Sequence, residues 1–244
     1  MQIITLGTSH GSAEPGRSCT ATLLRTSNKA YLFDCGGSVE VMLKNLDIPV
    51  GDIRCVFITH MHEDHLGSLS AIAKRFFHYC KNNETVKIFM PEEEGIVAFK
   101  SWLNAMHTRQ SDDIVSYYVV KPGVIYSDET ITVSAIPNDH MQNGLLPSFS
   151  YKVEAEGQKI IFTGDISGDF HDYPAVIYEE EFDAVVSELT HFNVLEHVKE
   201  IARSKTKQMI FTHVHKRNTT VIDTVRDEIP FPFYVAEDGQ SFEV

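Results

Sequence analysis

Residues 57–68 read FITHMHEDHLGS, where an apolar run ends in a dense group of histidines and carboxylates. Side chains alternate in an extended segment, so His60 and His62 point the same way and can bind one metal ion. Asp64 and His65 follow as the chain turns into the next element, within reach of a second ion. The spacing therefore predicts a metal-binding loop with two sub-sites rather than a chance cluster on a solvated loop.

The flanks of this loop predict a buried strand followed by a helix. The strand, IRCVFITH, ends at His60. After it, apolar residues recur at intervals of three and four, which is typical of an amphipathic helix with its apolar stripe turned inward. They are Leu66, Leu69, Ile72, Ala73, Phe76, Phe77 and Cys80. The histidine cluster is thus expected in a loop between a strand and a helix.

Strand and helix patterns alternate along the rest of the chain. Strands are expected at 3–7, 20–26, 29–36, 86–91, 114–123 and 130–138, and helices at 38–48 and 92–106. Residues 148–165 form a hairpin signal with Glu156 and Gly157 at its turn. A strand at 183–189, a helix at 193–203, a strand at 208–215 and a closing strand pair in 231–244 follow. The pattern predicts a single layered α/β domain, 1–244, with two sheets enclosed by helices.

Composition limits the environment and the partners of the chain. Its 244 residues, 43% of them hydrophobic, suffice for a large core. No basic leader and no apolar run of about 18 residues is present, so we expect a cytoplasmic protein without membrane contact. The formal net charge of −13 disfavours wrapping by a long nucleic acid. The four cysteines lie far apart, which predicts buried free thiols.

Further ligand-type residues end other apolar runs. His140 ends AIPNDH, Asp165 ends IIFTGD, and MIFTHVH ends in His213 and His215. One loop cannot complete two coordination spheres, so ligands from other strand ends are expected to join it. Asp165 can use both carboxylate oxygens and is suited to bridge two cations.

The motif HMHEDH, together with these strand-end residues, resembles the H-x-H-x-D-H signature of the metallo-β-lactamase-fold hydrolase superfamily. The resemblance spans Leu6 to Asn218 and implies an α/β fold, a four-layered αββα sandwich of two mixed β-sheets flanked by helices. Asp34 would support the metal loop. The resemblance implies that one metal ion is held by His60, His62 and His140, the other by Asp64, His65 and His213, and that Asp165 bridges them.

Two further stretches are similar to tRNA 3′-processing endonucleases and the small phosphodiesterases related to them. Residues 6–24, LGTSHGSAEPGRSCTATLL, resemble the opening G-T-x-x-G-x-P-R stretch of these enzymes. Residues 211–218, FTHVHKRN, resemble their closing T-H-x-S-x-R-Y stretch, with Arg217 in register. The oxygen-reducing diiron branch of the superfamily has a carboxylate where this chain has His62, so a hydrolytic site is favoured.

Two departures from that branch limit the expected substrate. The endonucleases insert a long tRNA-clasping arm between the third and fourth motifs, whereas here residues 141–164 suffice only for the hairpin. Their His-Glu-x-Thr motif is replaced by SELT at 187–190. We therefore expect a small phosphodiester substrate, nucleotide-like or of another kind, and no long nucleic acid as a partner.

The expected chemistry is hydrolysis by a hydroxide that two divalent metal ions activate. The ligand set suits zinc or manganese, and it also accepts iron. Asp64 is expected to orient the hydroxide, and His191 and His215 are candidate proton donors to the leaving group. The candidate substrate-binding residues are Arg217, Lys216 and His10. For these two histidines and the three substrate-binding candidates, an exposed or supporting role is the alternative.

Two other functions stay open at this point. A hydrolase of carboxylic substrates, such as a lactone, a thioester or a β-lactam, needs the same hydroxide but no basic residue beside the last ligand. The other is a metal-binding sensor without turnover, although the complete ligand set argues against it. A homodimer is compatible with the sequence, which carries no signal on oligomeric state.

Overall fold

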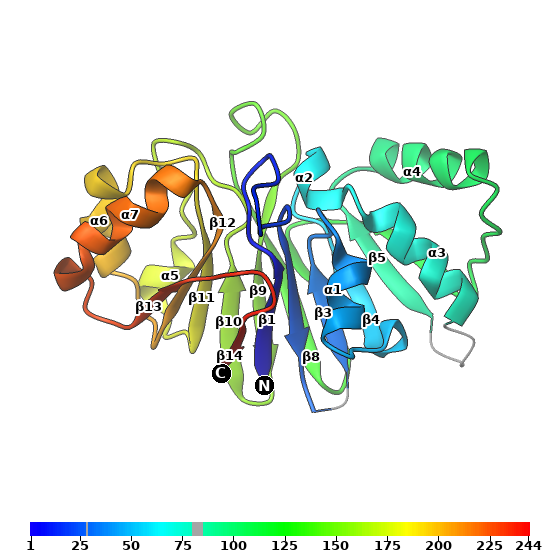
Figure 1. The fold of residues 1–244 in the computed structure, drawn as a ribbon, viewed down its shortest axis with the longest axis horizontal. Helices are drawn as coiled ribbons and strands as arrows, with labels where there is room; N and C mark the ends of the chain where they lie inside the picture. Colours follow the sequence, from blue (N-terminus) through cyan, green and yellow to red (C-terminus); the bar gives the residue numbers. More distant parts are fainter. Residues whose placement is uncertain (28, 80–84) are drawn as a thin grey trace.

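The computed structural model describes residues 1–27, 29–79 and 85–244. Within these ranges the strands form two seven-stranded sheets that lie face to face. Both chain ends lie at the same end of the molecule (Figure 1), and the backbone amide of Val244 donates to the Met1 carbonyl at 3.0 Å.

The first sheet joins an antiparallel half to a parallel half. In spatial order its strands are β14 (Ser241–Glu243), β1 (Gln2–Gly7), β2 (Ala21–Arg25), β3 (Ala30–Phe33), β4 (Ile53–Phe57), β5 (Val86–Met90) and β6 (Val115–Val119). The pairs from β14 to β3 are antiparallel, and those from β3 to β6 are parallel. The carboxyl ends of β3, β4 and β5 therefore share one edge.

The second sheet has the same mixed character. In spatial order its strands are β13 (Phe233–Val235), β12 (Met209–Val214), β11 (Ala184–Leu189), β10 (Gln158–Phe162), β9 (Phe149–Ala155), β8 (Ile131–Pro137) and β7 (Gly123–Ser127). The pairs from β13 to β10 are parallel, and those from β10 to β7 are antiparallel. The predicted hairpin is confirmed as β9–β10, with Glu156 and Gly157 at positive φ in its turn.

Helices cover the outer face of each sheet (Figure 1). Beside the first sheet are α1 (Val39–Asn45), η1 (Val50–Asp52), α2 (Glu63–Leu66), α3 (Leu69–Tyr79) and α4 (Glu93–Ala105). Beside the second are α5 (Val176–Glu179), α6 (Val194–Ala202), α7 (Lys216–Thr224) and η2 (Arg226–Glu228). The predicted four-layered αββα sandwich is confirmed.

Strand alternation explains how one chain fills three apolar cores. In β4, Cys55 and Phe57 face the second sheet, whereas Val56 faces the helices on the other side. Between the sheets, the rings of Phe33 and Phe162 stack with centroids 4.0 Å apart. The third core packs the outer face of the second sheet against α5–α7. Strands buried on both faces carry continuous apolar runs, which made them readable in the sequence.

The closing strands and the helix after the histidine loop differ in part from the sequence predictions. The closing strands exist, but they do not pair with each other, because β13 joins the second sheet and β14 the first. The predicted helix stripe is confirmed from Leu69 to Phe77 in α3, whereas Leu66 ends the separate short helix α2. Cys80 lies outside the described residues. In the part of the chain that is described, no helix combines the length and the hydropathy required to cross a bilayer.

Candidate metal centre

Asp34, the residue after β3, holds the histidine loop that follows β4. One Asp34 carboxylate oxygen accepts the backbone N–H of Thr59 at 2.8 Å. The other lies 2.8 Å from Nδ1 of His65, which leaves Nε2 of that ring free to face the centre. Asp34 itself adopts a left-handed backbone, φ 57°, so the chain turns sharply where the loop begins. This carboxylate therefore fixes both the loop and the orientation of His65.

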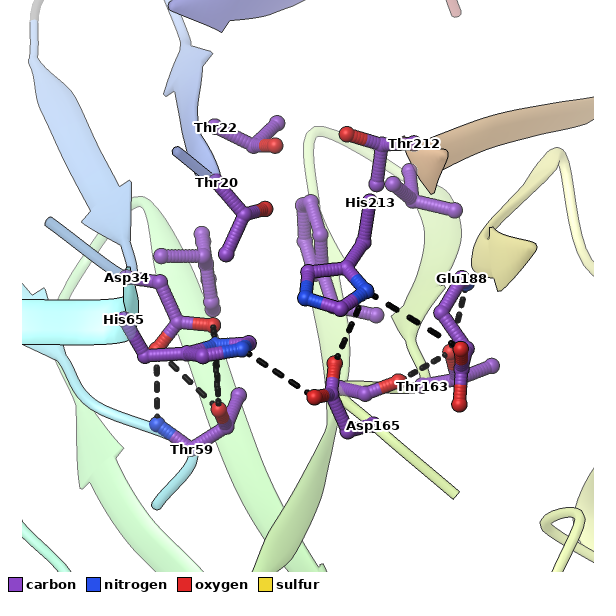
Figure 2. Close-up of a pocket in the computed structure, with 14 residues that line it drawn as sticks. Thr20, Thr22, Asp34, Thr59, His65, Thr163, Asp165, Glu188, Thr212 and His213 are labelled. Atoms are coloured by element: carbon purple, nitrogen blue, oxygen red, sulfur yellow. Dashed lines mark hydrogen bonds and ion pairs between the residues drawn. The ribbon is translucent and has the colours of Figure 1, made fainter. Parts of the chain in front are cut away.

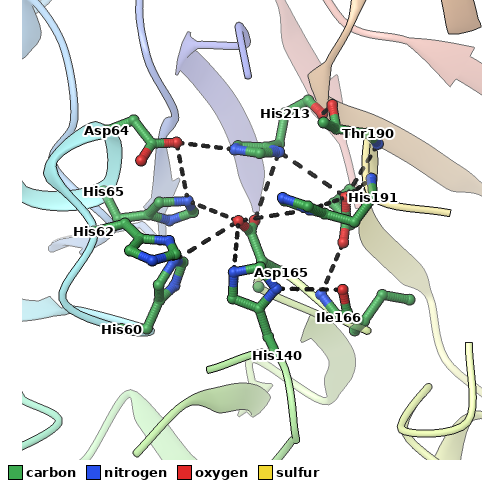
Figure 3. Close-up of polar contacts among 12 residues, drawn as sticks. His60, His62, Asp64, His65, His140, Asp165, Ile166, Thr190, His191 and His213 are labelled. Carbon is green, nitrogen blue, oxygen red and sulfur yellow. Dashed lines mark hydrogen bonds and ion pairs between the residues drawn. The ribbon is translucent and has the colours of Figure 1, made fainter. Parts of the chain in front are cut away.

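The residues predicted as metal ligands converge around Asp165, which follows β10 (Figure 3). The Asp165 Oδ2 atom lies 3.2 Å from Nε2 of His65 and 3.6 Å from Nε2 of His140. The donor atoms of two groups each lie within 4.8 Å of one another. One group is His60, His62, His140 and Asp165, and the other is Asp64, His65 and His213. Each group could hold a metal ion.

His213 reaches the centre through a β-bulge in β12. The ladder pairs Glu188 with Thr212 and then Leu189 with Val214, so His213 is the extra residue, and its φ is 49°. Bulges re-aim side chains and occur often beside functional sites. The ring thereby reaches Asp64, whose Oδ2 lies 3.1 Å from Nε2 of His213.

The chemistry of the buried donors fits divalent metal ions. Among the described residues, four buried atoms at the centre have no hydrogen-bond partner: Nε2 of His65, Nε2 of His140, Oδ1 of Asp165 and Nδ1 of His213. A buried polar atom left unpaired costs about 1–3 kcal/mol, so a cluster of them calls for a ligand. Metal coordination would satisfy such atoms.

The protonation states of His60, His140 and Asp165 agree with that fit. Burial lowers the pKa of His60 well below its usual value and also lowers the pKa of His140, so both imidazoles stay neutral. Burial alone would raise the pKa of Asp165, but the nearby His213 and His65 rings outweigh it and hold that pKa well below its usual value. Neutral imidazoles and ionised carboxylates are the forms that bind metals.

Glu188, near the end of β11, is a site residue that the sequence reasoning missed. Its side chain is buried, and one oxygen accepts the backbone N–H of Ile166 at 2.7 Å. The other accepts the backbone N–H groups of Thr190 and His191 and lies 2.8 Å from the His191 Nδ1 atom. The available signal was a carboxylate three residues before a histidine at the end of an apolar run.

His191, a predicted proton donor, lies at the metal centre. Its ring stacks on His213 with centroids 5.3 Å apart and meets the His140 ring at 4.6 Å. Burial lowers the pKa of His191, but the hydrogen bond to Glu188 and the negative charge of Glu188 outweigh burial and raise that pKa to about 9. The donor atoms of Asp165, Glu188, His191 and His213 also lie within 4.8 Å of one another.

The remaining candidates lie on the rim, where α7 begins. His215 caps this helix, because its Nδ1 accepts the backbone N–H of Arg217 at 3.1 Å. The His215 ring stacks on His10 with centroids 4.5 Å apart, and Glu14 lies 3.2 Å from Nε2 of His10. Lys216 and Arg217 are exposed in the first turn of α7. In the described part of the chain, neither cation belongs to the groups around Asp165.

The surroundings of this centre differ between a small inner cavity and its exposed edge. Behind Asp165 and His65, between the sheets, lies a cavity of about 30 Å³ that threonines and two phenylalanines line (Figure 2). This volume suits a water molecule or two but no organic substrate. His62 is exposed, and the His191 side chain is 31% exposed. These two histidines are therefore the ones that solvent, and a substrate, can reach.

Comparison with known proteins gives a family match over most of the chain. The model of the family described as "Anti-Pycsar protein Apyc1" matches residues 1–225. Among curated relatives, the ribonuclease Z of Rippkaea orientalis is 32% identical over 155 residues, which are 63% of this chain and 47% of that protein. The ribonuclease Z of a Cyanothece species is 33% identical over 159 residues, 63% of this chain and 46% of that protein. The chain thus spans about half the length of the curated relatives it matches.

Solved structures with the same fold cover the whole chain. Human tRNase Z, short form, superposes with a TM-score of 0.79 at 21% identity and covers 100% of this chain and 99% of its own. The metallo-β-lactamase fold protein YhfI from Bacillus subtilis has a TM-score of 0.78 at 14% identity, and the match covers 99% of this chain and 98% of that protein. A diphosphatase of the PhnP family has a TM-score of 0.73 at 16% identity, and the match covers 100% of this chain and 97% of that protein. The resemblance to the metallo-β-lactamase fold, in the branch of tRNA 3′-processing enzymes and related phosphodiesterases, is confirmed.

The expectation that no long nucleic acid serves as a partner is wrong as a general exclusion. The relatives above are named as ribonucleases, and a ribonuclease acts on RNA. The expectation rested on net charge and on the short 141–164 segment. Neither bears on the groups at the exposed edge of the centre, where the side chain of His62 is exposed and that of His191 is partly exposed.

Proposed function

Because the chain belongs to the family of the anti-Pycsar protein Apyc1, we propose that it is a metal-dependent phosphodiesterase. The observation that carries the proposal is the set of buried, unpartnered donor atoms around Asp165. Its donors are imidazoles and carboxylates from separate strand ends, as hydrolytic metal sites require. The names of the ribonuclease relatives support a phosphodiester as the bond that is cleaved.

We propose that the centre holds two divalent cations, zinc or manganese, with iron as a further choice. The ligands of one ion would be His60, His62 and His140, those of the other Asp64, His65 and His213, with Asp165 shared. When bound, the ions would supply hydroxide near neutral pH and would neutralise charge on the phosphoryl oxygens.

The chain itself would position the attacking and leaving groups. Burial would raise the pKa of Asp64, but contacts with His213 and His65 hold that pKa below its usual range, so Asp64 acts as an acceptor that orients the nucleophile. Glu188 binds Nδ1 of His191, so the Nε2 atom of His191 is free to give a proton to the leaving oxygen.

The rim would bind the rest of the substrate. Nδ1 of His215 accepts a backbone N–H, so its ring carries a proton at Nε2 and can donate to an anionic oxygen. Lys216, Arg217 and His10 would add contacts to a phosphate or to the group attached to it. Such contacts suit a nucleotide-like diester.

The test is a comparison of three substrates with protein stripped of metal and then supplied with Zn²⁺ or Mn²⁺. Turnover of bis(p-nitrophenyl) phosphate and of a dinucleotide, both dependent on metal, is the expected result. A precursor tRNA assayed beside them measures how the enzyme divides its activity between short and long diesters. Turnover of p-nitrophenyl acetate without diester turnover would instead identify a hydrolase of carboxylic substrates, and turnover of none would identify a metal-binding sensor.

A further inference from the structure

The loop at residues 8–18, between β1 and β2, forms one wall of the metal centre. It lies beside α2, in dark blue in Figure 1. A Cβ atom added at Gly11 would stand 3.8 Å from Oδ2 of Asp64, so the loop backbone passes directly over that side chain. His10, in the same loop, stacks on His215, which precedes α7. Whatever fixes this loop therefore fixes the shape of the rim where substrate would bind.

The loop is closed on itself by short-range hydrogen bonds. The backbone N–H of Ser9 donates to the Ser18 carbonyl at 2.8 Å, and Glu14 and Arg17 exchange backbone hydrogen bonds of 3.0 and 2.9 Å. Ser9 Oγ donates to the Ser12 carbonyl at 2.6 Å. These bonds shape the loop, and one backbone hydrogen bond, from the N–H of Val214 to the Thr8 carbonyl at 2.8 Å, joins its start to β12.

Asp238, near the end of the chain, ties down both ends of the loop. Its Oδ1 accepts a hydrogen bond from the Thr8 hydroxyl at 2.8 Å, and its Oδ2 accepts the backbone N–H of Ser18 at 2.6 Å. Arg17 adds a further link, because its Nη1 donates to the Thr8 hydroxyl at 3.0 Å and to the Ala236 carbonyl at 2.9 Å. We call Thr8, Arg17 and Asp238 the loop clasp.

The segment that carries Asp238 is itself held by both sheets. The backbone N–H of Ala236 donates to the carbonyl of Phe211 in β12, at 2.9 Å. The backbone N–H of Gly239 donates to the carbonyl of Thr5 in β1, at 2.6 Å. The clasp therefore connects a surface loop to a segment whose backbone is hydrogen-bonded to β12 and β1.

We propose that Asp238 is a positioning residue for the phosphodiesterase reaction proposed above. It acts through the 8–18 loop, holding His10 against His215 and the loop backbone against Asp64, so that the substrate-binding rim is formed before substrate arrives. The arginine of the opening G-T-x-x-G-x-P-R stretch serves the same purpose, since Arg17 binds Thr8 and Ala236. Preorganised contacts lower the entropic cost of binding, so the clasp acts mainly on substrate affinity.

The test uses Asp238→Asn in the full-length, metal-supplied protein. The amide keeps the shape of the carboxylate but removes its charge and leaves one acceptor oxygen in place of two, so the clasp is weakened. With bis(p-nitrophenyl) phosphate we expect KM to rise roughly fivefold or more, with a smaller change in kcat and unchanged metal content. Amide hydrogen exchange in residues 9–18 should speed up. Glu237→Gln, which removes a neighbouring exposed carboxylate outside the clasp, should behave as wild type.

A double-mutant cycle separates positioning from general stability. If Asp238 acts through the loop, Asp238→Asn should change KM by less than about twofold once His10→Ala is present. Effects that simply multiply, an unchanged KM, or loss of metal in Asp238→Asn would overturn the proposal. Thr8→Val, which removes the hydroxyl between Asp238 and Arg17, replaces Asp238→Asn if that variant is unstable. Absence of diester turnover in the wild type would overturn the proposed function, whereas normal wild-type turnover with unchanged KM in the variants would overturn the clasp alone.

Discussion

Asp165 is the residue on which the centre depends most. Its carboxylate is 2% exposed, and imidazoles from four segments of the chain lie within 3.7 Å of it: His60, His65, His140, His191 and His213. One of its oxygens has no hydrogen-bond partner in the described structure. A buried, ionised carboxylate at the meeting point of five imidazoles is arranged for cations rather than for protein stability.

Replacing Asp165 with asparagine should remove metal and activity together. The amide cannot supply a charged shared oxygen, so the cations would be under-coordinated and their mutual repulsion less compensated. Elemental analysis and diester turnover on the same sample check this. Asp112→Asn, which changes an exposed aspartate outside the groups around Asp165, is the matched control and should retain both metal and turnover. Full metal content in Asp165→Asn would contradict the shared-ligand role.

His191 should be separable from the ligands by its substrate dependence. A proton donor matters for an alkoxide leaving group and hardly at all for p-nitrophenolate, which leaves without protonation. His191→Ala should therefore slow dinucleotide cleavage by roughly 100- to 10,000-fold and leave bis(p-nitrophenyl) phosphate turnover nearly unchanged. Metal content should stay at the wild-type level. Loss of metal, or an equal loss on both substrates, would show that His191 is a ligand instead.

Arg217 should act on the phosphoryl group and not on the metals. Arg217→Ala is expected to lower diester turnover by roughly 10- to 1000-fold, about 1.4–4 kcal/mol of transition-state stabilisation, with metal content preserved. Hydrolysis of a neutral acyl ester should hardly change. Arg226→Ala, beyond the other end of α7, removes the same charge away from the rim and serves as control. Full diester activity in Arg217→Ala would show that Arg217 does not bind the phosphoryl group.

The sequence predicted the ligands because each stands at the end of an apolar run. Glu188 escaped prediction for a physical reason. Its partners are backbone amides at 166, 190 and 191, and the first of these comes from a different strand end. Only the parallel pairing of β10 with β11 brings the Ile166 amide to Glu188, and no local pattern records that pairing.

At the scale of elements, the loops that carry His140 and Asp165 are tied to each other. Asp172 accepts the backbone N–H of Asp139 at 2.8 Å and that of Ser167 at 2.9 Å. His171 lies between two carboxylates, with Nδ1 2.5 Å from Asp169 and Nε2 3.0 Å from Asp139. The loop after β8 and the loop after β10 are therefore linked directly to each other.

The His171 link should make stability depend on pH in a defined window. Hydrogen bonds to Asp169 and then Asp139 raise the pKa of His171 to about 9. Because this pKa is higher in the folded than in the unfolded state, protonated His171 stabilises the folded protein. The stabilisation is fully present at pH values below the unfolded-state pKa of about 6.5 and is lost as the pH rises through about 9. The melting temperature of His171→Asn should thus fall below that of wild type at pH 6 and approach it at pH 10.

The control for this experiment is His107→Asn, which changes an exposed histidine at a position of positive φ that asparagine tolerates. Its melting temperature should differ from wild type by the same amount at both pH values. A constant difference for His171→Asn as well would show that the charge on His171 contributes nothing.

The closing strands show what periodicity cannot determine. Apolar alternation predicted strands in 231–244, and both are present. Their partners depend on the 236–240 segment, which passes from β12 to β1 and turns at Gly239 with φ 83°. A strand pattern defines which face is buried but not which strand lies beside it.

For the whole molecule, the fold was predictable because the motifs are ordered along the chain and each follows a buried strand. The prediction of one domain over 1–244 stays a prediction, supported by cores that share the same two sheets. The partner exclusion failed because net charge describes the whole surface, whereas recognition depends on the few groups around the open side of the centre.

The most direct test of the central claim is a titration of metal-free protein with Mn²⁺ or Zn²⁺ while turnover of bis(p-nitrophenyl) phosphate is followed. A dinuclear phosphodiesterase predicts no turnover without metal, a rise on addition, and saturation near two equivalents per chain. Saturation at one equivalent would contradict the two-ion centre. Diester turnover that is absent at every metal content, or that survives in Asp165→Asn, would contradict the account as a whole.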